Sequence, residues 1–393
     1  MLEASNLPLP SAAAREVSDR LADQIRRSII EQAGPISFDE YMRIALYEPG
    51  LGYYLANAIN FGVDGDFITA PELSSLFGAS VARQCFDILQ HTGGDILEFG
   101  AGNGFLAAHV LTTLDELGAV PGRYMILELN PLMRERQRQT LQEVAPHVLS
   151  QVEWLNDLPS CKMNGVILAN EIIDALPVKI FRTANGEIHE RRVAEKGDHF
   201  IWSETPAPER LAGAVRARVD SNIIAADRDY VSEINSSVEP WVSDLSRVMG
   251  NAVALIFDYG YSRADYYSRD RTQGTLMCHF RHRQHNDPFW FPGLQDITAS
   301  VDFTALAEAA DSSGIRVAGF SEQGNFLLAS GLLDEAQRRA EKGDDRTLAR
   351  VAYETKVLTL PNEMGSRFKV LALTKGYNAA LRGFQLRDDR HRL

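Results

Sequence analysis

Apolar residues along the chain recur either at the three- to four-residue spacing of amphipathic helices or in short continuous runs typical of buried strands. Residues 12–33 have helical spacing, and Ser37 with Glu40 has the capping-box pattern that begins a second, short helix. The stretch 50–71 is rich in glycine and aromatic side chains and predicts an ordered, lid-like loop, after which helical spacing returns. We therefore expect N-terminal helices and a loop in residues 1–92.

Strand and helix patterns alternate in the next part of the chain, residues 93–177. Alternation of this kind indicates a parallel sheet whose strands are joined by crossover helices, and therefore an α/β core. The expected elements are strands at 95–100, 124–129, 150–155 and 165–170, and helices at 104–118 and 131–144.

The alternation then stops, and the pattern predicts an inserted α+β lobe at 178–250. Short strands are expected in 178–203, followed by a mostly helical stretch at 206–249. The core resumes in residues 251–393, where a late hairpin pair is expected. Its predicted elements are a strand at 252–258, a long irregular loop at 260–300, strands near 315–320 and 325–329, a helical insertion at 331–362 and a closing strand at 368–373.

The net charge and the number of cysteines disfavour some classes of protein. The net charge of −13 over 393 residues opposes a broad nucleic-acid surface or an anionic membrane surface. Three scattered cysteines indicate a reducing compartment without a disulfide framework. No apolar run is long enough to span a bilayer, and the N-terminus lacks a secretory pattern, so we expect a cytoplasmic protein with no membrane insertion.

The most informative motif is Asp-Ile-Leu-Glu-Phe-Gly-Ala-Gly-Asn-Gly at residues 95–104. A strand leads to Glu98 and then to a turn at Gly100, Gly102 and Gly104, where the backbone turns sharply and approaches a ligand closely. An acid so near a helix N-terminus would repel the pyrophosphate of a dinucleotide. It suits a ligand with a cationic amino acid moiety, such as S-adenosylmethionine. A tight strand–helix connection is the alternative.

Polar residues also follow the next two predicted strands. Glu128 ends the second strand, where a carboxylate accepts both hydroxyls of a ribose. Asn156 and Asp157 follow the third strand, and Asp157 is a candidate acceptor for an adenine amino group. For Asp157 alone, a helix or turn cap is an equally good interpretation. Together, the acids after successive strands favour a nucleotide-type ligand.

The fourth strand runs into Asn170 and the residues up to Pro177. Methyltransferases that act on base amines carry Asn-Pro-Pro-Tyr here, so the absence of proline after Asn170 disfavours a nucleobase acceptor. Glu171 and Asp174 are three residues apart and would share one face of a helical turn. Such a carboxylate pair suits a guanidinium, which offers five donors in a fixed fork. The alternative is a pair that caps the next helix.

The segment 278–285 places one cysteine and three histidines close together. Structural zinc sites usually have paired ligands separated by a longer spacer, and arginines are interleaved here, so we expect no metal. A loop that faces the substrate is the preferred interpretation. His282 would then be a hydrogen-bonding group or a base.

Taken as an ordered series, these motifs resemble the MidA-like family of S-adenosylmethionine-dependent methyltransferases, whose mitochondrial members are complex I assembly factors that methylate an arginine of a complex I subunit. The resemblance covers nearly the whole chain. The matching segments are 47–54, 65–72, 98–104, 170–177, 258–261, 274–276, 296–303, 364–365 and 368–371, with Glu233 as a further matching position.

The resemblance implies a class I, Rossmann-like, seven-stranded methyltransferase sheet with S-adenosylmethionine as donor. It also implies N-methylation of a protein arginine, with a respiratory complex subunit as one possible partner. Residues that would form the donor site or its cover are Asp66, Thr69, Pro71 and Glu72. Residues that would line the reaction site are Asn170, Glu171, Asp174, Asp258 and His282, of which Asn170 would also contact the donor.

Two other functions stay open at this point. One is a small-molecule N- or O-methyltransferase, which a deep, closed site would favour. The other is a non-catalytic assembly factor that retains the fold, which loss of S-adenosylmethionine binding would favour. An oxidoreductase is disfavoured because Glu98 opposes a pyrophosphate.

Overall fold

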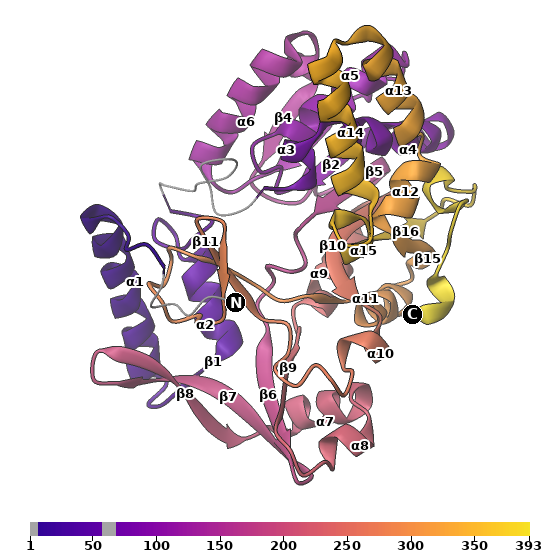
Figure 1. Cartoon of the computed structure of the whole chain (residues 1–393). Helices are drawn as coiled ribbons and strands as arrows, with labels where there is room; N and C mark the ends of the chain where they lie inside the picture. Colours follow the sequence, from indigo (N-terminus) through magenta and orange to yellow (C-terminus); the bar gives the residue numbers. More distant parts are fainter. Residues whose placement is uncertain (1–6, 57–67) are drawn as a thin grey trace. The chain divides into compact units, whose positions relative to one another are not determined.

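The structure of the chain is a computed structural model that describes residues 7–56 and 68–393. The chain divides into two compact units, each built from segments that are distant in sequence (Figure 1). Unit 1 comprises Met1–Phe67, Ile173–Pro240 and Tyr261–Asp302, and unit 2 comprises Ile68–Ile172, Trp241–Gly260 and Phe303–Leu393.

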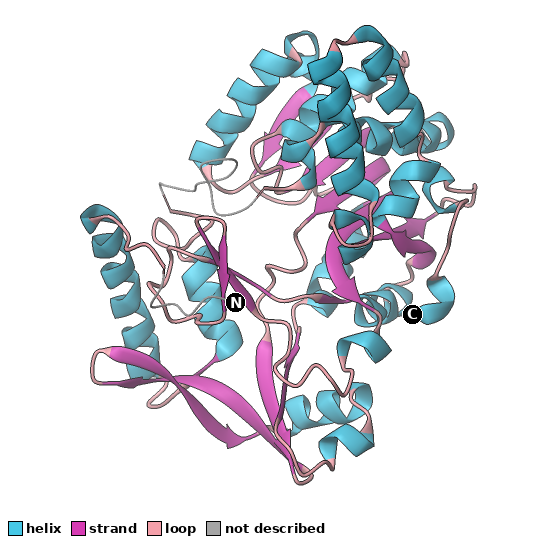
Figure 2. Cartoon of the chain, viewed as in Figure 1, coloured by secondary structure: helices cyan, strands magenta, loops and turns pink. Residues whose placement is uncertain are grey.

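Unit 2 contains the α/β core with a mainly parallel sheet (Figure 2). β2, β3, β4, β5 and β10 are mutually parallel, whereas β16 runs antiparallel to both β10 and β15. The expected closing strand at 368–373 is thus present as β16, in an antiparallel pairing. Seven strands of the sheet follow the order β15 (Arg316–Glu322), β16 (Phe368–Lys375), β10 (Met249–Tyr261), β5 (Met163–Asn170), β2 (Asp95–Phe99), β3 (Tyr124–Leu127) and β4 (Val152–Leu155).

The central strands of this sheet consist of continuous apolar runs, which is typical of strands that are covered by helices. Val166 to Ala169 in β5 are all buried, and Ile96 of β2 is in register with Val166. In Figure 1, α4, α5, α13 and α14 lie beside one another in unit 2. The helices that include residues of this unit are α3 (Ala70–Leu73), α4 (Ser75–Thr92), α5 (Phe105–Glu116), α6 (Pro131–Val144), η2 (Pro146–Gln151), α9 (Val238–Val248), α11 (Phe303–Ser312), α12 (Gln323–Ala329), α13 (Leu332–Lys342), α14 (Asp345–Thr359), α15 (Met364–Arg367), η3 (Arg382–Phe384) and η4 (Arg390–Arg392).

One sequence prediction in unit 2 is wrong. The stretch 325–329 was expected to be a strand and belongs instead to α12. A short apolar run does not distinguish a strand from a buried helix, and here tertiary packing decides. Phe326 is fully buried against Phe257 and Phe384, and an added Cβ on Gly324 would lie only 2.6 Å from the carbonyl oxygen of Thr359.

Unit 1 contains two smaller antiparallel sheets. In the first, the strand order is β1, β7, β6 and β9, and β8 pairs with β7; the second has the order β12, β11, β13. Its elements are α1 (Ala12–Glu31), β1 (Ile36–Ser37), α2 (Phe38–Tyr47), β6 (Lys179–Ala184), β7 (Glu187–Lys196), β8 (His199–Pro206), α7 (Glu209–Arg218), α8 (Ser221–Ile224), β9 (Tyr230–Ile234), α10 (Arg263–Tyr266), β11 (Met277–Phe280), β12 (Arg283–His285), β13 (Asp296–Thr298) and β14 (Val301–Asp302).

Three details of unit 1 differ from the expectations. β9 lies within the stretch predicted to be helical, and the predicted irregular loop 260–300 contains a three-stranded sheet. Ser37 precedes α2 but makes no side-chain capping bond. In the described ranges 7–56 and 68–393, no helix combines the length and apolar character that crossing a membrane requires.

Candidate functional site

The glycine turn between β2 and α5 adopts backbone conformations that favour glycine. The φ angles of Gly100, Gly102 and Gly104 are 55°, 51° and 86°. An added Cβ at Gly100 would lie 2.9 Å from Cδ1 of Ile172, and at Gly104 it would lie 3.1 Å from Cα of Gln137. At Gly102 it would meet no described atom within 4 Å. Among residues 7–56 and 68–393, the turn is therefore tightly packed at both ends and open at Gly102.

The side chain of Glu98, two residues before this turn, is buried rather than exposed. Glu98 is only 2% exposed, and the hydroxyl of Tyr124 donates to its Oε2 at 2.7 Å. Burial raises the pKa of Glu98 to about 7, although the bond from Tyr124 lowers it. This placement differs from the expectation of an acid that faces a ligand, because the residue occupies an inward position of β2.

Glu128 lies at the carboxyl end of β3, as predicted. Its Oε1 accepts from the backbone N–H of Asn130 at 2.9 Å, and its Oε2 accepts from the side-chain amide of Gln137 at 3.0 Å. Burial raises the pKa of this carboxyl, and these bonds lower it. A carboxylate has about four lone-pair positions, so Glu128 retains acceptor capacity beyond these two donors.

Gln137 of α6 is a residue that the sequence reasoning missed. Its Nε2 donates to the carbonyl of Gly102 at 3.0 Å as well as to Glu128, and its Oε1 accepts from the indole N–H of Trp154 at 2.9 Å. Gln137 thus ties the glycine turn to the ends of β3 and β4. The available signal was a polar residue within the apolar stripe Met133–Gln137–Leu141 of this helix.

Asn156 and Asp157 are exposed and directly follow β4. Arg134 connects this end of the strand to its neighbour: its guanidinium donates to Oδ1 of Asn156 at 2.6 Å, to the carbonyl of Leu155 at 2.8 Å and to the carbonyl of Glu128 at 2.7 Å. The ends of β3 and β4 are therefore held side by side.

The short helix α3 brings the residues predicted as the donor cover close to the glycine turn. Thr69 is its N-cap, Pro71 lies in its first turn, and Oε2 of Glu72 accepts from the backbone N–H of Thr69 at 3.3 Å. Oε1 of Glu72 accepts from the side-chain amide of Asn103, which lies inside the turn. Asp66, the fourth predicted cover residue, lies outside the described residues.

Asn170 ends β5, Glu171 follows it, and Asp258 lies in the adjacent strand β10 where its pairing with β5 stops. Asn170 is in register with Phe257, whose carbonyl accepts from the N–H of Glu171 at 2.8 Å. The Asn170 amide donates to Oε1 of Glu171 at 3.2 Å. Asp258 is fully buried, and its Oδ1 accepts from the N–H of Tyr259 at 2.9 Å. Glu171 therefore directly follows β5, and Asp258 lies in β10 one residue beyond its last pair with β5.

The predicted helical turn carrying Glu171 and Asp174 is absent. Glu171 has a left-handed φ of 54°, and no helix lies between the end of β5 and β6. Both the shared helical face and the helix-capping alternative are therefore wrong. A left-handed conformation is unfavourable for a residue with a long side chain and is concentrated at functional sites. Asp174 belongs to unit 1, where it is buried and its carbonyl accepts from the N–H of Ala299 at 2.9 Å.

His282 lies exposed at the tip of a β-hairpin in unit 1. β11 and β12 pair so that Arg281 and His282 form a two-residue turn with φ angles of 47° and 59°. Cys278 and His285 face each other across the strands and are both buried. Within the part of the chain that the structure describes, no three histidine, cysteine or acidic residues are grouped so as to hold a metal ion.

Comparison with known proteins identifies the fold and the donor. The family model described as "Putative S-adenosyl-L-methionine-dependent methyltransferase" matches residues 80–321, more than half of the chain. A crystal structure from Burkholderia thailandensis bound to S-adenosyl-homocysteine is 38% identical, with a TM-score of 0.93, and the match covers 99% of this chain and 100% of that one. A native structure from the same organism, also 38% identical, has a TM-score of 0.91 with the same coverage.

Among curated proteins, a Drosophila melanogaster relative is named "Protein arginine methyltransferase NDUFAF7 homolog, mitochondrial". It is 30% identical, and the match covers 95% of this chain and 89% of the relative. The Danio rerio protein arginine methyltransferase NDUFAF7 is 27% identical, with 92% and 89% covered. The chain therefore belongs to the MidA-like family of S-adenosylmethionine-dependent methyltransferases.

Proposed function

We propose that this methyltransferase N-methylates an arginine side chain of a protein substrate. The observation that carries the proposal is that Glu171 directly follows β5, the neighbour of β2, and that Asp258 lies in β10 just beyond its last pair with β5. Two carboxylates in this position suit a cationic, planar guanidinium, which is recognised by several charge-assisted hydrogen bonds. The relatives named protein arginine methyltransferases support the same acceptor class.

The donor site that we propose surrounds the glycine turn. Glu128 would accept the ribose hydroxyls, the space beside Gly102 would admit the donor, and Glu72 would cover it through its bond to Asn103. Other proposed donor residues are Asp66, Thr69, Pro71, Gly100, Gly104, Asn156, Asp157 and Asn170. The S-adenosyl-homocysteine bound by the Burkholderia thailandensis structure supports a ligand of this size and charge in the family.

In the proposed reaction, catalysis arises mainly from positioning and electrostatics. S-adenosylmethionine supplies an electrophilic methyl group on its sulfonium. Glu171 would orient the guanidinium and stabilise its positive charge. A nitrogen of the guanidinium forms the new bond to carbon as the bond to sulfur breaks, and the nitrogen then releases one proton. Asp258 would accept that proton.

The test uses labelled S-adenosylmethionine. The full-length protein is added to lysate from a strain that lacks it, and mass spectrometry locates the transferred methyl group. We expect label on protein arginine with the wild-type protein and about a hundredfold less with Glu171→Gln. Label in small molecules alone would overturn the proposal in favour of a small-molecule methyltransferase. Donor binding with no transfer to any fraction would favour a non-catalytic assembly factor.

A further inference from the structure

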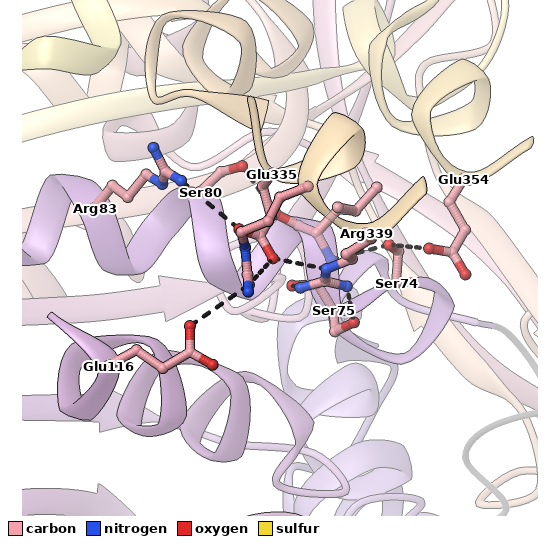
Figure 3. Close-up of polar contacts among 10 residues, drawn as sticks. Ser74, Ser75, Ser80, Arg83, Glu116, Glu335, Arg339 and Glu354 are labelled. Atoms are coloured by element: carbon pink, nitrogen blue, oxygen red, sulfur yellow. Dashed lines mark hydrogen bonds and ion pairs between the residues drawn. The ribbon is translucent and has the colours of Figure 1, made fainter. Parts of the chain in front are cut away.

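The helices α13 and α14 carry two carboxylates that are buried against the core of unit 2. Glu335 of α13 is surrounded by three guanidinium groups: Arg338 at 2.6 Å, Arg339 at 2.7 Å and Arg83 of α4 at 3.6 Å (Figure 3). These bonds lower the pKa of Glu335 although burial raises it. A buried carboxylate with this many partners holds the three arginines in defined positions.

The second carboxylate, Glu354 of α14, bonds directly to the beginning of α4. The hydroxyl of Ser74 donates to Oε2 of Glu354 at 2.7 Å and accepts from the N–H of Leu76 at 3.0 Å. Its hydroxyl therefore caps α4 and contacts α14 at the same time. Arg339 donates to the hydroxyl of the next residue, Ser75, as Figure 3 shows. Two helices from the end of the chain thus hold the residues that begin α4.

These two serines directly follow α3. We call residues 69–75 the α3 segment. α3 has only four residues, and a helix of that length is not stable without contacts from its surroundings. On one side the segment contacts the glycine turn through Glu72 and Asn103, and on the other it contacts α13 and α14 through Ser75 and Ser74. Its position therefore depends on both sets of contacts.

We propose that Glu354 and Arg339 are positioning residues for donor binding. They hold the α3 segment so that Glu72 remains against Asn103 in the glycine turn, and they act on the donor through that segment without touching it. This inference rests on the proposed donor site. It assigns a function to the helical insertion, which the sequence pattern left without one. Loss of the Glu354–Ser74 bond should therefore weaken donor binding.

The experiment compares three variants of the full-length protein by calorimetry with S-adenosyl-homocysteine. Glu354→Ala removes the acceptor for the Ser74 hydroxyl and should weaken binding at least fivefold. Glu354→Gln keeps an acceptor oxygen at the same place and should bind within about twofold of wild type. Val351→Ala is the matched control, because Val351 is a buried apolar residue of the same helix that makes no polar bond to Ser74. It should lower the melting temperature and leave affinity unchanged.

Two results would overturn the inference. One is wild-type affinity in Glu354→Ala. The other is a loss of affinity in Val351→Ala equal to that in Glu354→Ala at equal melting temperature, which would make the role merely structural. Gly102→Val separates this failure from failure of the donor site. If Gly102→Val abolishes binding while Glu354→Ala does not, only the positioning role fails. If Gly102→Val binds normally, the donor site itself is misplaced.

Discussion

Replacing Glu98 by Gln keeps the shape of the side chain and an acceptor oxygen for Tyr124, but removes a titrating group from the core of unit 2. The pKa of Glu98 is raised to about 7 by burial, from 4.5 in a solvated chain. Between these two values, the folded protein holds a proton that the unfolded chain has released. The wild-type protein therefore loses stability as the pH rises through this window, because ionising the folded state requires a buried negative charge.

Each tenfold change in proton affinity corresponds to about 1.4 kcal/mol. The difference between the two pKa values therefore lowers the free energy of unfolding of the wild-type protein by about 3 kcal/mol as the pH rises from below the lower value to above the higher one. Glu98→Gln has no such cost at any pH. Relative to wild type, the variant should gain roughly 2 to 3 kcal/mol in free energy of unfolding between about pH 5 and about pH 8.

Urea denaturation of both proteins at about pH 5 and pH 8 measures this gain. The matched control is Glu363→Gln, the same exchange at a side chain that is 38% exposed, which should show no comparable gain. A stability difference between Glu98→Gln and wild type that does not change with pH would refute the reasoning. Affinity for S-adenosyl-homocysteine should stay within about twofold, because the Glu98 carboxyl is buried and bonded to Tyr124. A tenfold loss would instead support contact between this carboxylate and the donor.

Gly102→Val should abolish S-adenosyl-homocysteine binding in calorimetry, because valine is strained at a φ of 51° and its side chain enters the open space beside the turn; unchanged affinity would contradict the site. Glu171→Gln should keep donor affinity and melting temperature but reduce turnover about a hundredfold. Normal turnover in Glu171→Gln would show that this carboxylate does not hold the guanidinium. Gln137→Ala should weaken donor binding by about tenfold, since it releases Gly102, Glu128 and Trp154 together; equal affinity would show that the turn holds its shape alone.

The local sequence pattern was sufficient to predict the position of those site residues that lie directly at the end of a strand. A glycine turn that follows a buried strand lies at the carboxyl end of that strand. For the same reason, Glu128 lies at the carboxyl end of β3 and Asn170 at the carboxyl end of β5. The antiparallel position of β16 was also predictable, from its resemblance to the last strand of a methyltransferase sheet. These features follow from the order of elements, which the sequence contains directly.

Tertiary structure alone decided the direction of individual side chains. Glu98 is adjacent to the glycine turn in sequence, yet its place in β2 turns its carboxyl toward Tyr124. Gln137 is distant from the turn in sequence and bonds to it because α6 packs there. The spacing of Glu171 and Asp174 suggested a helix, but the carbonyl of Phe257 accepts from the N–H of Glu171 at 2.8 Å, and the backbone there turns left-handed.

The division of the chain into two units also depends on tertiary contacts between segments that are distant in sequence. Ile36 of β1 pairs with Val193 of β7 in one sheet of unit 1, although the strands of the core separate them in sequence. Periodicity reports which face of a segment is apolar, not which distant segment covers it. The sequence by itself determined the alternating strands and helices at 95–170, the glycine turn and the donor class, because these depend on local conformation and residue chemistry. The partners of buried polar groups were decided only by tertiary structure, because a buried group bonds to whichever donor or acceptor the packing brings within reach.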